Sequence, residues 1–120
     1  MARAGSETKY PWGDEFDASK ALYSGGTASV GSYAANAFGV HDTAGNVWEW
    51  VEDCWHKSYD GAPGDGSVWT SGGDCRIRVL RGGSWNNVPW SLRSAYRFRN
   101  YTAIRFNIID GFRIARTLSR

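Results

Sequence analysis

The stretch GVHDTAGNVWEWVEDCW, from Gly39 to Trp55, decides what kind of fold this chain can adopt. It contains a Gly-Asn turn, after which Trp48 and Trp50 alternate with valine and glutamate. This period of two predicts a strand over residues 47–51. Because tryptophans bury large areas, they can anchor a core that has few long elements. The stretch therefore favours a loop-rich fold built around buried tryptophans.

The rest of the chain has the composition of the same kind of fold. Its 120 residues include seven Trp, six Tyr, five Phe and fifteen Gly, which is typical of aromatic anchors joined by tight turns. This length allows one domain with a single modest core. Further short strands are predicted in RIRVLRGGSW (residues 76–85) and GFRIARTL (residues 111–118), with loops over residues 1–40 and 57–74. The predicted core positions in these strands are Val79, Leu80, Phe112 and Ile114.

No membrane segment or metal cluster is predicted from the sequence. No apolar run approaches the roughly 20 residues that span a bilayer, and the N-terminus lacks the apolar stretch of a signal peptide, so we expect a soluble protein without membrane insertion. Compartment and oligomeric state are not indicated. Cys54 and Cys75 are the only cysteines. They either form a disulfide, which we favour, or lie close together as free thiols.

Charge is sorted along the chain. Residues 1–75 hold eleven acidic and four basic residues, a net charge of −7, whereas residues 76–120 hold ten arginines and one acidic residue, Asp110, a net charge of +9. The arginines either bind nucleic acid or pair with carboxylates and backbone carbonyls inside the domain. The absence of lysine from the basic half favours the second, because the planar guanidinium fills fixed sites with several hydrogen bonds. We therefore expect no nucleic-acid partner.

Three motifs carry a family resemblance: GVHDTAGNVWEWVEDCW, RVLRGGSW and GFRIAR, with ARAG and YPWGDE upstream. In this order and spacing they resemble the C-terminal half of the formylglycine-generating-enzyme (sulfatase-modifying factor) domain, a variant of the C-type lectin fold. The resemblance implies an α+β, irregular, loop-rich fold with short antiparallel strands and little helix. Residues 1–120 would form one such domain. Since family domains are usually longer, we expect the chain to be the C-terminal portion of one.

In that family, the region of GNVWEW is similar to a calcium-binding loop. Transferred residue by residue, the resemblance implies Asn46, the Val47 carbonyl and Glu49 as calcium ligands. Hard oxygen ligands suit calcium, but two side chains are few for an ion that takes roughly six to eight ligands. The alternative is a turn asparagine and an arginine-paired glutamate. Apart from a possible structural calcium, no cofactor is expected.

Catalytic residues are not predicted. Family members that oxidise a substrate cysteine hold copper through two cysteines just after the GGS-aromatic motif, where this chain reads NNVPWSLRSAYR (residues 86–97). Soft Cu(I) requires thiolates, and none is present there. Another enzymatic branch uses iron held by a histidine cluster, but this chain has only His41 and His56. The alternative is a formylglycine-generating or related oxidase-type domain whose chemistry lies on other residues.

The C-terminal segment is also similar to the frame of the variable proteins of diversity-generating retroelements, VLRGGSWNN-P--LRSA-R-RN----R----GFR-A. These are lectin-fold proteins that bind ligands through a hypervariable surface. The resemblance implies a ligand-binding segment over about residues 88–110. Its contact positions would be Val88, Trp90, Ser91, Tyr96, Phe98, Tyr101, Thr102, Ala103, Ile104, Phe106, Ile108 and Ile109. The intervening scaffold arginines would be Arg93, Arg97, Arg99, Arg105 and Arg113.

The two sets of residues suit complementary roles. Guanidinium groups bonded to backbone carbonyls would fix the chain whatever the intervening side chains are. Aromatic residues concentrate binding energy at interfaces, and the small polar residues between them give adaptable hydrogen bonds. The alternative for any one contact position is burial in the core. A patch this apolar discriminates poorly among free sugars, so the expected partner is a protein or cell-surface macromolecule.

Overall fold

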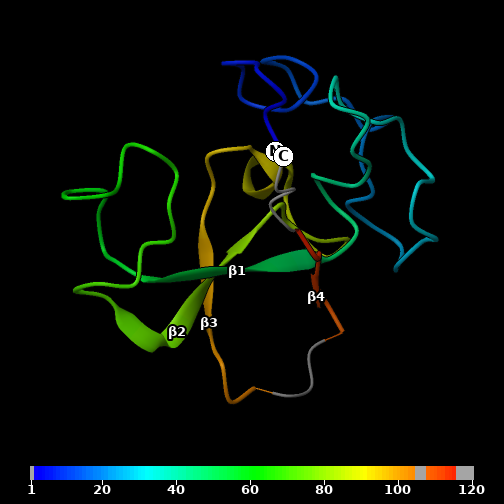
Figure 1. Cartoon of the computed structure of the whole chain (residues 1–120). Coiled ribbons are helices and arrows are strands. Elements are labelled where there is room, and N and C mark those ends of the chain that lie inside the picture. The colour runs from blue at the N-terminus through cyan, green and yellow to red at the C-terminus, as the bar shows by residue number, and fades with distance from the viewer. Residues whose placement is uncertain (1, 105–107, 116–120) are drawn as a thin grey trace.

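The computed structural model describes residues 2–104 and 108–115, and a four-stranded sheet lies at its centre (Figure 1). The strands are β1 (Trp48–Trp55), β2 (Asp74–Arg81), β3 (Phe98–Tyr101) and β4 (Asp110–Phe112). Their order in the sheet is β3-β2-β1-β4. Within the described residues, helix is limited to the short 3-10 turn η1 (Pro89–Leu92). The expectation of a loop-rich fold with short strands and little helix is confirmed.

One edge of the sheet differs from the expected antiparallel arrangement. β1 pairs with β2, and β2 with β3, in antiparallel fashion, but β4 runs parallel to β1. After β3 the chain crosses from one edge of the sheet to the other before it pairs again, and a crossover of this kind brings in a parallel strand. β4 also begins and ends earlier than the predicted terminal strand, since it stops at Phe112.

A row of apolar residues crosses all four strands in register. Leu80 is paired with Phe98 on one side and with Trp50 on the other, and Trp50 is paired with Phe112. Side chains of directly paired residues lie on the same face of a sheet. Leu80, in the middle of the row, is fully buried. Val79, whose side chain points to the opposite face of the sheet, is also buried, so both core predictions for β2 are confirmed.

The predicted burial of Phe112 and Ile114 is wrong. Their side chains are 77% and 85% exposed. Phe112 belongs to the outer strand of the sheet, where the described residues supply no covering layer, and Ile114 follows that strand. The alternation of apolar and polar residues was therefore a sound signal for a strand but not for its burial.

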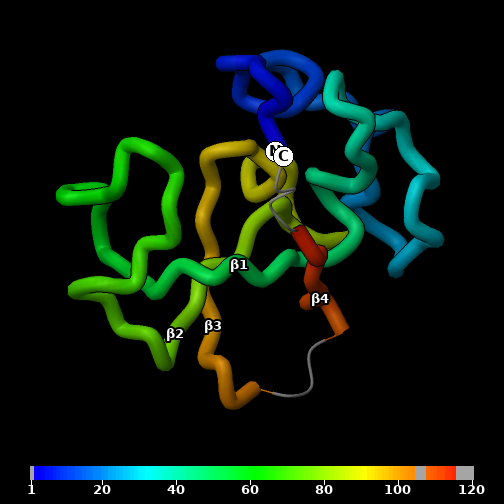
Figure 2. The backbone as a smooth tube through the Cα atoms, viewed as in Figure 1, coloured from blue at the N-terminus to red at the C-terminus, as the bar shows by residue number. Residues whose placement is uncertain are grey.

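The N-terminal loops form a second packed region beside the sheet (Figure 2). Its buried centre comprises Tyr10, Ala21, Ala44 and Leu92, with Trp12, Phe16 and Tyr23 packed against it. Gly45 links this region to β1, with a left-handed φ of +83°, and a side chain there would collide with the backbone of Leu22. The Gly-Asn turn read from the sequence therefore fixes where the loops meet the sheet.

The two cysteines form a disulfide between β1 and β2, as favoured from the sequence. Cys54 is fully buried, and Arg78 donates hydrogen bonds to its sulfur and to the Glu52 carbonyl. The bridge closes the loop of residues 56–73, which lies beyond one end of β1 (Figure 1). Among the residues that the structure describes, no helix has the length and apolar character needed to cross a membrane.

Candidate ligand-binding surface

Eight of the predicted contact positions are exposed in the structure. Six of them carry large apolar side chains, each at least 39% exposed, and two carry small ones. The large ones are Val88, Trp90, Phe98, Tyr101, Ile104 and Ile108, and the small ones are Thr102 and Ala103. We call these eight residues the apolar surface. Burying bulky apolar groups is favourable, so such a concentration in one segment marks a candidate binding surface.

Three predicted contact positions behave differently, and one lies outside the described residues. Ser91 is only 5% exposed because it belongs to η1, which packs inward together with Leu92, so it cannot present its side chain to a ligand. Tyr96 and Ile109 are half-buried. The Ile109 carbonyl accepts a hydrogen bond from the Trp48 amide, which ties it to β1. Phe106 falls outside the described residues.

A buried tryptophan forms the floor under two of these aromatic side chains. The Trp48 ring, 2% exposed, stacks on Phe98 with a centroid separation of 5.2 Å and contacts Tyr96 at 5.9 Å. Tyr96 in turn meets Trp90 edge-to-face at 4.8 Å. The chain of rings thus runs from the core at Trp48 to an exposed indole at Trp90.

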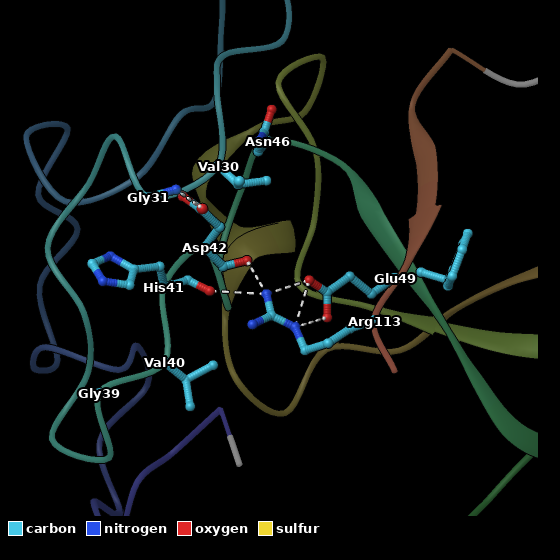
Figure 3. A pocket seen from close by; sticks show the side chains of 10 residues that line it. Val30, Gly31, Gly39, Val40, His41, Asp42, Asn46, Glu49 and Arg113 are labelled. Carbon is cyan, nitrogen blue, oxygen red and sulfur yellow. Dashed lines mark hydrogen bonds and ion pairs between the residues drawn. The ribbon is translucent and has the colours of Figure 1, made fainter. Parts of the chain in front are cut away.

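Arg113 makes the most hydrogen bonds of the predicted scaffold arginines that the structure describes (Figure 3). Its Nε lies 3.0 Å from both carboxylate oxygens of Glu49, and its terminal nitrogen lies 2.5 Å from one of them. The same terminal nitrogen donates to the carbonyls of His41 at 2.8 Å and Asp42 at 3.3 Å. The hydrogen bonds to Glu49 raise the pKa of Arg113 above its ordinary value. One side chain therefore joins the end of β4 to β1 and to the preceding loop.

Two other arginines hold the backbone of residues 90–96. Arg93 Nε donates to the Trp90 carbonyl at 2.8 Å. Arg81, at the end of β2, donates to the carbonyls of Ala95 at 3.1 Å and Tyr96 at 3.2 Å. Arg81 was not among the predicted scaffold residues, although its place directly before the Gly-Gly turn was a signal that could have identified it. The expected bonding of guanidinium groups to backbone carbonyls is found at both residues.

Arg97 and Arg99 depart from that expectation. The Arg97 guanidinium lies over the rings of Trp55, at 4.8 Å, and Tyr59, at 4.1 Å, while Arg99 lies over Trp55 at 4.7 Å. These cation–π contacts replace the predicted bonds to carbonyls. The physical reason is that Trp55, at the end of β1, and Tyr59 offer aromatic faces within reach of these guanidinium groups. Arg105 lies outside the described residues.

Two of the three predicted calcium ligands, Asn46 and Glu49, have other partners, whereas no partner of the Val47 carbonyl is found among the described residues. Asn46, with a φ of +65°, exchanges two hydrogen bonds of 3.2 Å with the backbone of Ala28. Glu49 is paired with Arg113. These contacts match the alternative of a turn asparagine and an arginine-paired glutamate. A calcium ion at Glu49 would have to displace the guanidinium of Arg113, so these contacts disfavour the site. The structural calcium stays an untested prediction.

Asn46 and Glu49 both line a pocket of about 510 Å³ beside β4 (Figure 3). Among the described residues, no group of three or more histidine, cysteine, aspartate or glutamate side chains could hold a metal ion. His41 contacts the Tyr33 carbonyl, and both ring nitrogens of His56 face carbonyls, those of Cys54 and Ser71. His56 also stacks on Trp69 with a centroid separation of 3.5 Å. Both histidines therefore have structural contacts.

A short sheet, a disulfide-bridged strand pair and long loops held by arginine and aromatic contacts define a loop-rich β domain with an exposed apolar surface. Residues 1–118 match the model of the sulfatase-modifying factor enzyme 1-like domain, and the chain belongs to this family. The resemblance read from the sequence motifs is thereby confirmed.

Relatives with different names are similar to this chain in sequence. Serine/threonine-protein kinase pkn1 of Chlamydia caviae is 38% identical over 113 residues, which covers 92% of this chain and 18% of the kinase. Hercynine oxygenase of Mycolicibacterium smegmatis is 34% identical over 128 residues, which covers 93% of this chain and 28% of the oxygenase. The chain thus spans less than a third of the length of either protein.

Two solved structures share the fold. PvdO from Pseudomonas aeruginosa matches with a TM-score of 0.83 and 41% identity, over 92% of this chain and 46% of PvdO. Treponema denticola variable protein 1 matches with a TM-score of 0.73 and 28% identity, over 92% of this chain and 41% of that protein. The fold of this chain is therefore found in a variable protein as well as in the family of sulfatase-modifying factors.

Proposed function

We propose that this chain is a non-catalytic, receptor-type domain that binds a protein or cell-surface macromolecule through the apolar surface. One observation carries the proposal. Six large apolar side chains of a single segment point to solvent, while the backbone beneath them is held by residues outside the exposed set. Arg81 donates to the carbonyls of Ala95 and Tyr96, and the Trp48 amide donates to the Ile109 carbonyl. A surface built this way can change its contact residues without losing its fold. The likeness to a variable protein supports the same function.

The apolar surface has enough area for specific binding. Each aromatic side chain that loses about 100 Å² of apolar area to a ligand contributes about 2.5 kcal/mol, before the cost of association. Three such anchors are sufficient for roughly micromolar affinity. Thr102, an exposed member of the apolar surface, can supply a hydrogen bond to a polar ligand group. The mixture of aromatic and small polar residues resembles that of antibody binding sites.

An enzymatic domain of the sulfatase-modifying type is the second candidate. It is favoured by the identity to hercynine oxygenase, of which this chain covers only 28%, so the chemistry would lie on residues outside the chain. A peptide with a sulfatase-type cysteine, supplied with copper and oxygen, separates the two candidates. The receptor proposal predicts no turnover of this peptide by the domain, and oxidation of its cysteine to an aldehyde would favour the enzyme.

Selection from a diversified library tests the receptor proposal directly. Positions Val88, Trp90, Tyr101, Thr102 and Ile104 would be randomised, and the displayed library panned against serum albumin as an arbitrary protein probe. Folded binders are expected, each with a different set of residues at these positions. If the library yields only unfolded variants, or folded variants without binders, the proposal is wrong. A library of the same size at Val79, Leu80 and Leu92 serves as the control and should not fold.

Two tyrosine substitutions distinguish exposed from buried contact positions. Ala103→Tyr places a ring on an exposed position, and we expect its free energy of unfolding to change by less than about 0.5 kcal/mol. Ser91→Tyr forces the same ring into the buried turn η1, and overpacking should cost about 2 kcal/mol or more. Chemical denaturation followed by tryptophan fluorescence measures both. Equal losses in the two variants would mean that exposure does not decide tolerance in this segment.

A further inference from the structure

We propose that a second site, next to the apolar surface, binds the carboxylate groups of an acidic segment of a protein ligand. We call it the arginine pocket, and it is formed by Trp55, Lys57, Ile77 and Arg99, with Arg97 beside it. The inference goes beyond the proposed function, because it concerns a charged pocket between β1, β2 and β3 rather than the exposed apolar positions. The test of the arginine pocket does not depend on whether the residues of the apolar surface vary.

Uncompensated positive charge is the first observation. Within residues 2–104 and 108–115, two arginine–carboxylate ion pairs are found, Arg76–Asp74 and Arg113–Glu49. Neither Arg97 nor Arg99 takes part in them. Both guanidinium groups instead lie within 5 Å of the centre of the same indole ring, that of Trp55. Two positive charges held around one ring attract an anion more strongly than either does alone.

The cation–π contacts leave hydrogen-bond donors available. Each guanidinium group carries five N–H donors, and its attraction to a ring uses its charge rather than a bond to a protein acceptor. In the described part of the chain, neither Arg97 nor Arg99 donates a hydrogen bond to a protein atom, in contrast to Arg81, Arg93 and Arg113. Contact with the rings also restricts both side chains, which lowers the entropy cost of binding a carboxylate through two bonds.

A pocket of about 530 Å³ opens beside these groups. Trp55 and Ile77 give it an apolar wall, and Lys57 and Arg99 supply positive charge. Asp74 also lines it, but this carboxylate is neutralised by two hydrogen bonds from Arg76, of 3.0 and 2.9 Å, which lower its pKa. A second lining carboxylate, that of Asp60, accepts a hydrogen bond of 2.8 Å from the Ser58 hydroxyl.

The shape of the site favours an acidic protein segment over nucleic acid. The pocket holds one or two side chains, whereas phosphate recognition along a strand requires a row of cations. Tyr101, an exposed member of the apolar surface, is paired across the strands with Ile77 of the pocket wall. A ligand with a carboxylate next to an aromatic or aliphatic residue would therefore contact Arg99 and Tyr101 at once.

An acidic and a neutral peptide form the test. We would titrate N-acetylated Glu-Tyr-Glu amide and its Gln-Tyr-Gln counterpart into the chain at low salt and follow the Trp55 indole N–H by NMR, assigned with Trp55→Phe. The acidic peptide should shift this signal. Arg99→Gln should weaken its binding about fivefold or more, because a charge-assisted pair is lost. The matched control Lys9→Gln removes one exposed positive charge outside the pocket and should leave binding unchanged.

Three results would overturn the arginine pocket. They are equal binding of the two peptides, unchanged affinity in folded Arg99→Gln, and preferential binding of an oligothymidylate of equal charge. Should Arg99→Gln fail to fold, Lys57→Gln replaces it, because this exposed lysine also lines the pocket and is expected to weaken the acidic peptide alone. A negative result for the arginine pocket would not change the outcome expected from the diversified library. The two proposals can therefore be contradicted independently.

Discussion

Arg113→Ala is expected to lower the free energy of unfolding by about 3 kcal/mol, because it leaves a carboxylate and two carbonyls without their donor. The Glu49 side chain is 23% exposed, so water replaces the lost guanidinium only in part. The carbonyls of His41 and Asp42 lose the same partner. The end of β4 would then be attached to β1 by little more than its short parallel pairing. Urea denaturation of the disulfide-intact protein measures the loss.

The chain contains a matched control for this variant. Arg76 forms the other arginine–carboxylate pair found among the described residues, with Asp74, but its side chain is 84% exposed. Exposed pairs contribute little, so Arg76→Ala should cost less than about 0.5 kcal/mol. Arg113→Lys should fall between the two, since an ammonium group keeps the charge but cannot match the planar fork. Similar losses in Arg113→Ala and Arg76→Ala would show that the contacts to His41 and Asp42 contribute nothing.

The sequence was sufficient to predict the elements whose signals are local. The alternating tryptophans predicted the strand that became β1, and the run before the Gly-Gly turn predicted β2. The disulfide between Cys54 and Cys75 was also favoured. For the two strands the deciding feature, a period of two or a turn glycine, lies within a few residues, whereas the disulfide was favoured because these two cysteines, 21 residues apart, are the only ones in the sequence. The family motifs added the loop-rich fold.

Burial and partner choice could not be predicted in the same way, because both depend on distant parts of the chain. Phe112 has the pattern of a core residue, yet its exposure is set by the position of β4 at the edge of the sheet. Ser91 falls at a variable position of the frame, yet η1 turns it inward. The ring of Trp55 accepts Arg97 and Arg99 only because β1 and β3 are brought close by β2.

Trp48→Ala should be the most damaging single substitution considered for this chain, with an expected loss of about 4 kcal/mol. The indole is 2% exposed and lies under both Phe98 and Tyr96, so its removal leaves a cavity below the apolar surface. The surrounding sheet cannot collapse into that space without breaking the pairing of β1 with β2 and β4. Thermal and urea unfolding should agree on the loss.

Trp90→Ala is the control for Trp48→Ala, because it removes an exposed tryptophan instead of a buried one. The same residue type is removed, but Trp90 is 51% exposed and meets Tyr96 only by an edge-to-face contact, so we expect a loss below about 1 kcal/mol. A large difference in the free energy of unfolding between the two variants would mean that buried Trp48 stabilises the segment. The exposed rings would then be available to contact a ligand. Comparable losses would mean that the exposed rings are themselves part of the core. The segment could not then exchange its contact residues, and the receptor proposal would lose its physical basis.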